Sequence, residues 1–246
     1  MLTASWTSFR QAEHGTWVVA HRGASARHRD SSAEAFEQAI ADGANAVETD
    51  VRRSKDGVFL CHHDETLKHT AGLDVALSEI TYQQLRHLAP DAAVRLEDVL
   101  ERTRGRCNML LDLKLHDPED VRALLRLLES RQVDDSIAIG VRSLETQALV
   151  GRLAPALVQL GLLASADQIP QFVASGGAWV RLWQQDASHL RIEAARALGV
   201  PVLVMVGGPG TGRAIGDIDA QQARALVARG AAGLMLNDPR VALPRA

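Results

Sequence analysis

The chain has few cysteines and aromatic residues, no excess of basic charge and no long apolar run. Of its 246 residues two are cysteines, and only 4% are Phe, Trp or Tyr. Cys61 and Cys107 are too few for a disulfide framework, so we expect buried thiols in a reducing compartment. A core with so few aromatic residues has to be built mainly from Ala, Val and Leu, as in many α/β proteins.

Charge and hydropathy exclude two classes of partner. The formal net charge is −3 at pH 7, and the arginines are interleaved with acidic residues, so the basic footprint of a nucleic-acid-binding protein is missing. No run approaches the roughly 18 apolar residues of a membrane span, and the first residues do not resemble a signal peptide. We therefore expect no nucleic-acid partner, no membrane span and a cytoplasmic location. No sequence feature indicates an oligomeric state.

Short apolar runs alternate with helical patterns through almost the whole chain. The predicted strands are 17–20, 45–51, 58–62, 108–114, 136–141, 157–163, 178–183, 201–206 and 232–236. Helices with recognisable ends are predicted over 33–42, 118–131, 188–198 and 220–229. Repeated alternation is typical of a parallel sheet, and this many units favour a closed (β/α)8 barrel, whose usual length is roughly 250 residues. Because no linker divides the chain, we predict one α/β domain, a TIM-type barrel over residues 1–246.

The sequence has nine predicted strands, whereas a (β/α)8 barrel needs eight. The additional strand indicates a hairpin. There is no room for a helix between Asp50 and His63, and Asp56-Gly57 is typical of a tight turn. We therefore expect a β-hairpin in place of the helix after the second strand. With Asp56 and Gly57 as the two central residues, Asp50 would face His63, and Glu48 would point to the same side.

Polar side chains follow the first three predicted strands. His21 and Arg22 end the first strand, Glu48 and Asp50 lie at the end of the second, and His63 follows the third. Two carboxylates that point into the mouth of a barrel need a cation to be tolerated there. Histidines beside a divalent metal are typical of general acid/base chemistry on a phosphodiester.

Asp112 and Lys114 repeat the spacing of Glu48 and Asp50 at the end of the fourth predicted strand. A structural salt bridge is one interpretation. At the same face of the barrel they would instead supply a third carboxylate and a cationic contact for phosphate. His28, His62 and His69 lack a comparable position at the end of a strand.

Two further patterns leave alternatives open. The glycine-rich segment 207–212 has neither the Lys-Ser/Thr of a Walker loop nor the spacing of a dinucleotide fingerprint. It favours a flexible strand-to-helix loop over the barrel mouth rather than a phosphate-binding nest. Trp179 and Trp183 are spaced to face the same side of a strand, either as core residues or as an aromatic wall for the head group of a ligand.

Several short stretches occur in an order and spacing that belong to a known family. They are His21-Arg22-Gly23-Ala24-Ser25, Glu48-Thr49-Asp50-Val51, Lys55-Asp56-Gly57-Val58, His63-Asp64-Glu65-Thr66-Leu67, Asp112-Leu113-Lys114 and the segment 230–239. The chain resembles the glycerophosphodiester phosphodiesterase family. The resemblance implies a (β/α)8 barrel with one divalent cation, Mg²⁺ or Ca²⁺ and alternatively Mn²⁺, at its C-terminal face. By position it implies His21 and His63 as the acid/base pair, Glu48, Asp50 and Asp112 as metal ligands, and Arg22 and Lys114 as phosphate contacts.

The chain also departs from the family pattern. Arg29-Asp30-Ser31-Ser32 stands where the family usually has Pro-Glu-Asn-Thr, and Asp112 replaces a longer Glu. The leading hypothesis is a metal-dependent phosphodiester hydrolase that releases an alcohol from small-molecule glycerophosphodiesters by acid/base catalysis with two histidines. Alternatives are the same barrel acting on a lysophospholipid head group or a sugar phosphodiester, and a barrel that binds a phosphorylated ligand without turnover.

Overall fold

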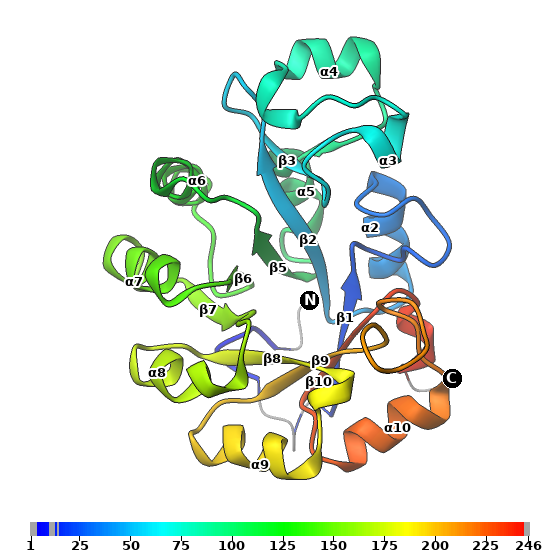
Figure 1. Cartoon of the computed structure of the whole chain (residues 1–246), viewed down its shortest axis with the longest axis vertical. Helices are drawn as coiled ribbons and strands as arrows, with labels where there is room; N and C mark the ends of the chain where they lie inside the picture. Colours follow the sequence, from blue (N-terminus) through cyan, green and yellow to red (C-terminus); the bar gives the residue numbers. More distant parts are fainter. Residues whose placement is uncertain (1–3, 10–12, 14, 244–246) are drawn as a thin grey trace.

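Eight parallel strands close into a barrel surrounded by helices (Figure 1). The computed structural model of the chain describes residues 4–9, 13 and 15–243. Its strands are β1 (Trp17–His21), β2 (Ala46–Arg53), β3 (Phe59–Cys61), β4 (Val94–Arg95), β5 (Asn108–Leu113), β6 (Ile137–Val141), β7 (Val158–Gly161), β8 (Trp179–Trp183), β9 (Val202–Met205) and β10 (Gly233–Leu236). Its α-helices are α2 (Ala33–Ala41), α3 (Lys68–Ala71), α4 (Tyr82–Leu88), α5 (Leu96–Thr103), α6 (Pro118–Ser130), α7 (Leu144–Leu153), α8 (Ile169–Ala174), α9 (His189–Ala197) and α10 (Ala220–Ala228). The 3₁₀ helices are η1 (Leu77–Glu79), η2 (Ala166–Gln168), η3 (Gln184–Asp186) and η4 (Pro239–Val241).

The order of the strands defines the barrel. Around it the parallel strands run β1, β2, β5, β6, β7, β8, β9 and β10, and β10 pairs with β1 to close the ring. Strands β3 and β4 continue outward from β2 as an antiparallel extension. The predicted α/β barrel is confirmed, and in it β8 lies across the ring from β2.

Helix α6 illustrates how local sequence defines these elements. The Asp117 side chain accepts a hydrogen bond from a backbone N–H of the first turn, and Pro118 is the first helical residue, as expected for a helix start. Val121, Leu124 and Leu128 are buried along one face. This helical spacing packs α6 onto the outside of the barrel.

Tryptophans fill the barrel interior at the end where the strands begin. Trp17 and Trp179 stack with their ring centroids 5.6 Å apart, and Trp6 packs edge-on against both. The Trp6 indole N–H donates to the carbonyl of Met109 at 2.9 Å. Trp179 is therefore a core residue, and polar side chains occupy the opposite end, where the parallel strands finish.

The predicted hairpin between β2 and β3 is present, but its loop is longer than predicted. The Ser54 N–H donates to the Val58 carbonyl, and the Gly57 N–H donates to the Ser54 carbonyl. Three residues, 55–57, therefore form the loop instead of two. Gly57 has a φ of 89°, which suits a three-residue hairpin whose last loop residue adopts the left-handed conformation.

The longer loop shifts the register of the hairpin by one residue. Val51 lies opposite Cys61, and the N–H of His62 donates to the carbonyl of Asp50. The prediction that Asp50 faces His63 is therefore wrong, because His62 takes that place. His62 is buried, and its ring nitrogens contact the Asp64 carbonyl and the Thr70 hydroxyl.

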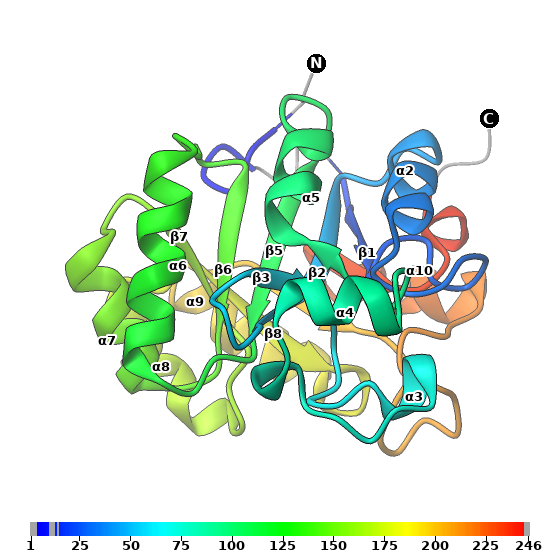
Figure 2. The ribbon, with the colours of Figure 1, turned by 90° about the horizontal axis from the view of Figure 1, so that it is seen from above.

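The segment between β3 and α5 forms a separate layer over one side of the barrel. It contains α3, η1 and α4 and packs around its own apolar cluster, which includes Leu67, Leu77 and Leu85. Figure 2 shows α3 and the orange loop between β9 and α10 at the same end of the barrel. This end carries the polar side chains described below.

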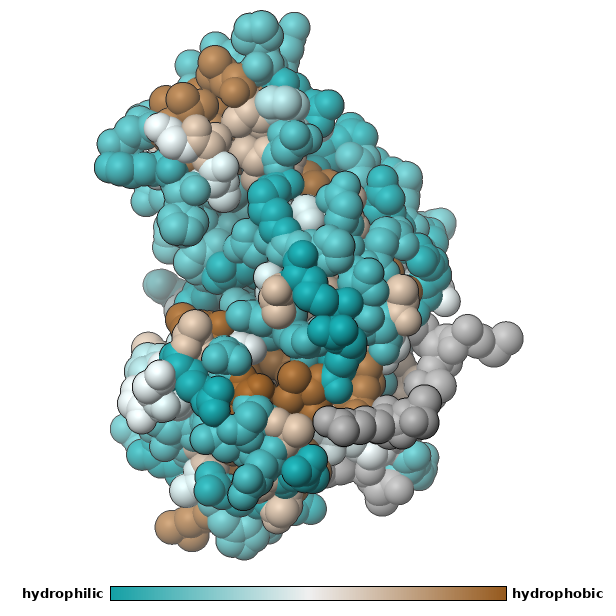
Figure 3. All heavy atoms as spheres, turned by 90° about the vertical axis from the view of Figure 1, so that its right-hand side faces the viewer, coloured by the Kyte–Doolittle hydropathy of each residue, from teal (hydrophilic) through white to brown (hydrophobic). Residues whose placement is uncertain are grey.

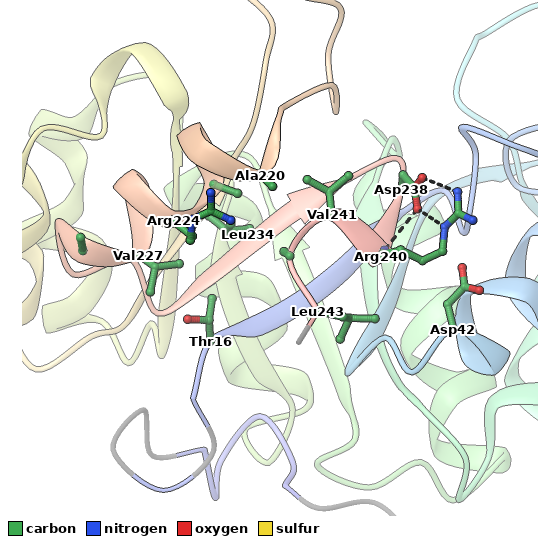
Figure 4. A pocket seen from close by; sticks show the side chains of 13 residues that line it. Thr16, Asp42, Ala220, Arg224, Val227, Leu234, Asp238, Arg240, Val241 and Leu243 are labelled. Carbon is green, nitrogen blue, oxygen red and sulfur yellow. Dashed lines mark hydrogen bonds and ion pairs between the residues drawn. The ribbon is translucent and has the colours of Figure 1, made fainter. Parts of the chain in front are cut away.

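A cavity of about 950 Å³ lies outside the barrel, beside η4 and α10 (Figure 4). Within the described residues after β10 the chain forms only η4, where a barrel of this type usually adds an outer helix. Val227, Leu234, Val241 and Leu243 line the cavity, which contains none of the predicted site residues. Figure 3 shows one hydrophobic patch in the lower half of the molecule and another at its upper end.

In the part of the chain that the structure describes, no helix is long and apolar enough to cross a membrane.

Candidate active site

Three carboxylates meet where β2 and β5 end. Parallel pairing places Asp112 beside Asp50, and Glu48, two residues earlier, shares their face. One carboxylate oxygen of each residue lies within 4.8 Å of the others. All three side chains are buried. The predicted carboxylate cluster is therefore formed, whereas the metal-ligand role of its members stays a prediction.

Burial and mutual repulsion act on these carboxylates. Burial, followed by the charges of Asp50 and Asp112, raises the pKa of Glu48 well above its usual value. Burial also acts to raise the pKa of Asp50, but the charges of Lys114 and Arg22 outweigh it and lower that pKa. The cluster thus combines a carboxylate that resists ionisation with one held ionised by its cations.

Lys114 and Arg22 bind the carboxylates directly. Lys114 Nζ lies 3.0 Å from both Asp50 Oδ1 and Asp112 Oδ2. Arg22 Nε lies 3.1 Å from Asp50 Oδ2, and the Arg22 backbone N–H donates to Glu48. Both residues were predicted as phosphate contacts, and the structure brings both cationic groups to the mouth of the barrel.

Arg142 is a site residue that the sequence analysis missed. It follows β6, and its guanidinium donates two hydrogen bonds to Asp112, from Nε at 2.8 Å and from Nη2 at 2.5 Å. Its position directly after a predicted strand is the same signal that selected His21. Asp112 therefore has two cationic partners, Lys114 and Arg142.

His21 is held by a residue from the far end of the chain. Its Nδ1 lies 2.8 Å from Asn237 Oδ1, while Asn237 Nδ2 donates to the carbonyl of Ile215. With the amide oriented in this way, Oδ1 accepts a proton from Nδ1, and the other ring nitrogen, Nε2, keeps its lone pair. Nε2 lies 4.0 Å from Glu48 Oε2.

Burial is also the main electrostatic influence on His21. Burial, followed by the charge of Arg22, lowers the pKa of His21 from 6.5 to about 4. The imidazole is therefore neutral near pH 7 and able to accept a proton at Nε2.

His63 reaches the same cleft in spite of the shifted register. The backbone leaves the β3 pairing after Cys61, and Arg52 Nε donates to the His63 carbonyl at 2.8 Å. His63 Nδ1 lies 2.7 Å from Asp64 Oδ1, and its side chain is 41% exposed. His21 and His63 line one cleft of about 650 Å³.

Hydrogen bonds hold the glycine-rich segment 207–212 and the residues after it. Gly207 N–H donates to Gln184 Oε1 at 2.7 Å, and the backbone of Gly208 pairs with that of Arg213. A Cβ at Gly216 would lie only 2.0 Å from Asn237 Oδ1, so glycine makes room for Asn237 there. The predicted strand-to-helix loop is present between β9 and α10, and hydrogen bonds join it to the residues that follow β8 and β10; its flexibility stays a prediction.

The carboxylate cluster fits a hard divalent cation. All its donors are carboxylate oxygens, the ligands that Mg²⁺ and Ca²⁺ prefer. Asp50 Oδ2 is enclosed and accepts no hydrogen bond, although Arg22 Nε lies 3.1 Å away, so its capacity to accept is not used by the described residues.

Comparison with known proteins gives the family. The model of the glycerophosphoryl diester phosphodiesterase family matches residues 21–202, which are 182 of the 246 residues. The chain belongs to this family. The matched span contains His21, His63 and the three carboxylates but ends before Asn237.

Similarity to curated members of the family covers only part of the chain. The chain is 40% identical over 84 residues to the probable glycerophosphodiester phosphodiesterase 1 of Mycobacterium tuberculosis, a match of 34% of this chain and 30% of that relative's length. It is 27% identical over 155 residues to the glycerophosphodiester phosphodiesterase of Bacillus altitudinis, covering 57% of this chain and 63% of the relative.

Solved structures resemble nearly the whole chain. The glycerophosphodiester phosphodiesterase of Agrobacterium tumefaciens has a TM-score of 0.75 at 25% identity, with 92% of this chain and 98% of that chain covered. A phosphodiesterase of Oleispira antarctica, solved in complex with the product sn-glycerol-3-phosphate, has a TM-score of 0.78 at 17% identity, with 92% and 94% covered. These similarities agree with the barrel, and the second bears on the fold alone.

Proposed function

We propose that the protein hydrolyses small-molecule glycerophosphodiesters with the help of one divalent cation. Glu48, Asp50 and Asp112 would hold the cation. His21 would act as general base and His63 as general acid, which assigns to each histidine the role that the sequence left open.

One observation carries this proposal: His21 Nδ1 lies 2.8 Å from Asn237 Oδ1, which leaves Nε2 as the ring nitrogen that faces the carboxylate cluster, 4.0 Å from Glu48 Oε2. A barrel that only binds a phosphorylated ligand needs no base at that point. Membership of a phosphodiesterase family supports the same reaction class.

The proton transfers follow from the hydrogen bonds of the two histidines. His21 Nε2 would take the proton of the attacking hydroxyl, and Nδ1 would keep its hydrogen bond to Asn237. The P–O bond to the alcohol then breaks, and His63 Nε2 would give its proton to the departing oxygen. The Asp64 carboxylate on His63 Nδ1 pairs with the charge that His63 carries before this transfer.

The cationic side chains would hold the phosphate. Arg22 and Lys114 lie beside the carboxylate cluster, and their donors suit non-bridging phosphate oxygens. A bound divalent cation would supply Lewis-acid stabilisation of the charge that develops on those oxygens.

Activity on glycerophosphocholine, followed by ³¹P NMR with Mg²⁺, Ca²⁺, Mn²⁺ or chelator, tests the proposal. We expect cleavage that chelator abolishes and a cation restores. His21→Ala and His63→Ala should each lower kcat by about 10²–10⁴-fold, as for a positioned acid or base. His189→Ala, a change of an exposed histidine on α9, is the matched control and should keep kcat near that of the unchanged protein.

The same spectra identify the nucleophile. A transient cyclic glycerophosphate would indicate attack by the glycerol 2-hydroxyl, whereas direct formation of the monoester would indicate water. Cleavage only of a lysophospholipid or a sugar phosphodiester would move the proposal to that substrate. Tight binding of phosphorylated ligands without any turnover would overturn it in favour of a binding protein.

A further inference from the structure

A second group of polar side chains lies across the barrel from the carboxylates, on β8. Residues at alternate positions of a strand share a face, and Trp179 belongs to the apolar cluster inside the barrel. Arg181 and Trp183 therefore also face the interior, progressively nearer to the end where the polar side chains gather. Arg142, the partner of Asp112, follows β6 at this same end.

Arg181 is a buried cation without a counter-ion. It is only 9% exposed, and among the described residues it forms no hydrogen bond and no ion pair. Its guanidinium lies over the face of Trp183, whose ring centroid is 4.4 Å from the guanidinium carbon. Removing a charge from water without pairing it costs several kcal/mol, and a bound anion would remove that cost.

The charge of Arg181 persists at neutral pH. Burial, followed by the charge of Arg142, lowers the pKa of Arg181 to about 10. The charges of Asp112 and Asp186 act in the opposite direction but do not offset this lowering, and the guanidinium remains charged.

Arg181 borders a pocket of about 230 Å³ at the ends of β7 and β8. The two acidic residues in its wall already have partners: Asp186 pairs with Arg191 at 2.5 Å, and Asp167 accepts from the Ser165 hydroxyl at 3.1 Å. None of the Arg181 nitrogens is among the fully enclosed polar atoms that lack a partner. The guanidinium is therefore open to a small ligand in the pocket.

The same arrangement disfavours a cationic head group such as choline. An aromatic cage for a quaternary ammonium needs a free ring face. One face of Trp183 carries the Arg181 guanidinium, and a Cβ at Gly208 would lie 3.2 Å from the ring. Trp179 is packed among the core tryptophans. Of the two interpretations left open for these tryptophans, the structure thus supports core packing for Trp179 and a guanidinium partner for Trp183.

We propose that Arg181, oriented by Trp183 and assisted by Arg142, is an anion-binding subsite for diesters that carry a second negative group, a carboxylate or a phosphate monoester, in addition to the scissile phosphate. The inference rests on the proposed phosphodiesterase function and adds the class of substrate. The second negative group belongs either to the alcohol half or to the glycerol half of the diester. The experiment distinguishes these two positions.

The test compares diesters that differ only in this charge. The reference is the 1,3-propanediol diester of sn-glycerol 3-phosphate. One anionic diester replaces propanediol with 3-hydroxypropionate, and the other replaces glycerol 3-phosphate with 3-phosphoglycerate. A choline diester supplies the cationic case. We expect kcat/KM for at least one anionic diester to exceed that of the reference by about tenfold or more, as for one charge-assisted hydrogen bond.

Substitution of Arg181 tests whether this residue causes the preference for the anionic diester. Arg181→Met should remove the preference for the anionic diester, and Arg181→Lys, which keeps the charge but not the planar stacking, should retain part of it. The ratio of kcat/KM values is the readout. Arg196→Gln, which removes an exposed arginine paired with Glu193 on α9, is the matched control and should leave the ratio unchanged. Arg181→Met removes an unpaired buried charge, so its Tm should be higher than that of the unchanged protein. This measurement also shows that the variant folds.

A binding measurement separates failure of the subsite from failure of the proposed function. In calorimetric titrations 3-phosphoglycerate should bind more tightly than glycerol 3-phosphate, and Arg181→Met should abolish the difference. If no diester is cleaved but this difference holds, the phosphodiesterase function is wrong and the subsite stands. An unchanged preference in Arg181→Met, equal binding of the two ligands, or a preference of the unchanged protein for the choline diester overturns the subsite.

Discussion

Asn237 Oδ1 lies 2.8 Å from His21 Nδ1, although 216 positions separate the two residues in the chain. The contact joins the end of the last barrel strand to the end of the first, and the Asn237 backbone and side chain are in turn bound to Gly216 and Ile215. The loop between β9 and α10 therefore acts on the proposed base through Asn237, which we regard as a positioning residue.

Asn237→Leu should lower kcat by about 10–100-fold and change KM far less. The variant keeps the volume of the side chain but leaves His21 free to rotate or change tautomer, so fewer molecules present a lone pair at Nε2. Steady-state kinetics on the best diester provide the measurement. A change confined to KM would show that Asn237 contributes to binding of the substrate instead.

The low pKa of His21 predicts an unusual pH profile. A general base works when deprotonated, and burial, followed by the charge of Arg22, lowers this pKa to about 4. We expect kcat/KM to stay level as the pH falls from about 7 to about 5 and to decline only nearer 4. Asn237→Asp adds a negative charge beside the ring, so it should move the acidic limb to higher pH. An acidic limb near pH 6.5 in the unchanged protein would contradict His21 as the base.

The same shift predicts how stability depends on pH. The unfolded chain takes up a proton on His21 near pH 6.5, whereas the folded chain does not until about pH 4. The contribution of His21 to the free energy of unfolding is therefore fully present above about pH 6.5 and is lost as the pH falls from there through about 4.

Glu48→Gln should stabilise the metal-free protein and abolish its response to cations. Burial, then the charges of Asp50 and Asp112, raises the Glu48 pKa. The stabilising effect of protonated Glu48 is therefore present at low pH and lost as the pH rises through the raised pKa. Because glutamine stays neutral, we expect about 1–4 kcal/mol of added stability in chelator at pH 8.

Thermal melts with and without Mg²⁺ or Ca²⁺ provide this measurement. The cation should raise the Tm of the unchanged protein but not of Glu48→Gln. Glu129→Gln, a change of an exposed residue on α6, is the matched control and should keep the response to the cation. A full response in Glu48→Gln would exclude Glu48 as a ligand.

Gly57→Val should lower stability, metal affinity and activity together, although Gly57 is remote from the carboxylate cluster. Gly57 has a φ of 89°, and a side chain in the left-handed region costs about 1–2 kcal/mol. A Cβ would also lie 2.9 Å from Arg53 Nη2. Gly57→Asn is the comparison, since asparagine tolerates this conformation. Full activity of a destabilised Gly57→Val would show that the hairpin does not position His63.

Local patterns were enough to predict the barrel and the side chains at its mouth. The period-2 runs that end at His21, Asp50 and Asp112 are properties of neighbouring residues, and parallel strands place their ends at one face of the barrel. The same reasoning applied to every strand end would also have found Arg142 and Asn237, which follow β6 and β10 directly.

Tertiary structure alone decided how these side chains pair. Asp56-Gly57 predicts a turn but not whether two or three residues form it. The difference of one residue placed His62, instead of His63, opposite Asp50. The contacts of Arg142 with Asp112, of Asn237 with His21 and of Arg181 with Trp183 depend on burial, and only the closed barrel sets that burial. An unpaired charge has no signature in the sequence, because the absence of a counter-ion depends on every residue that surrounds it after folding.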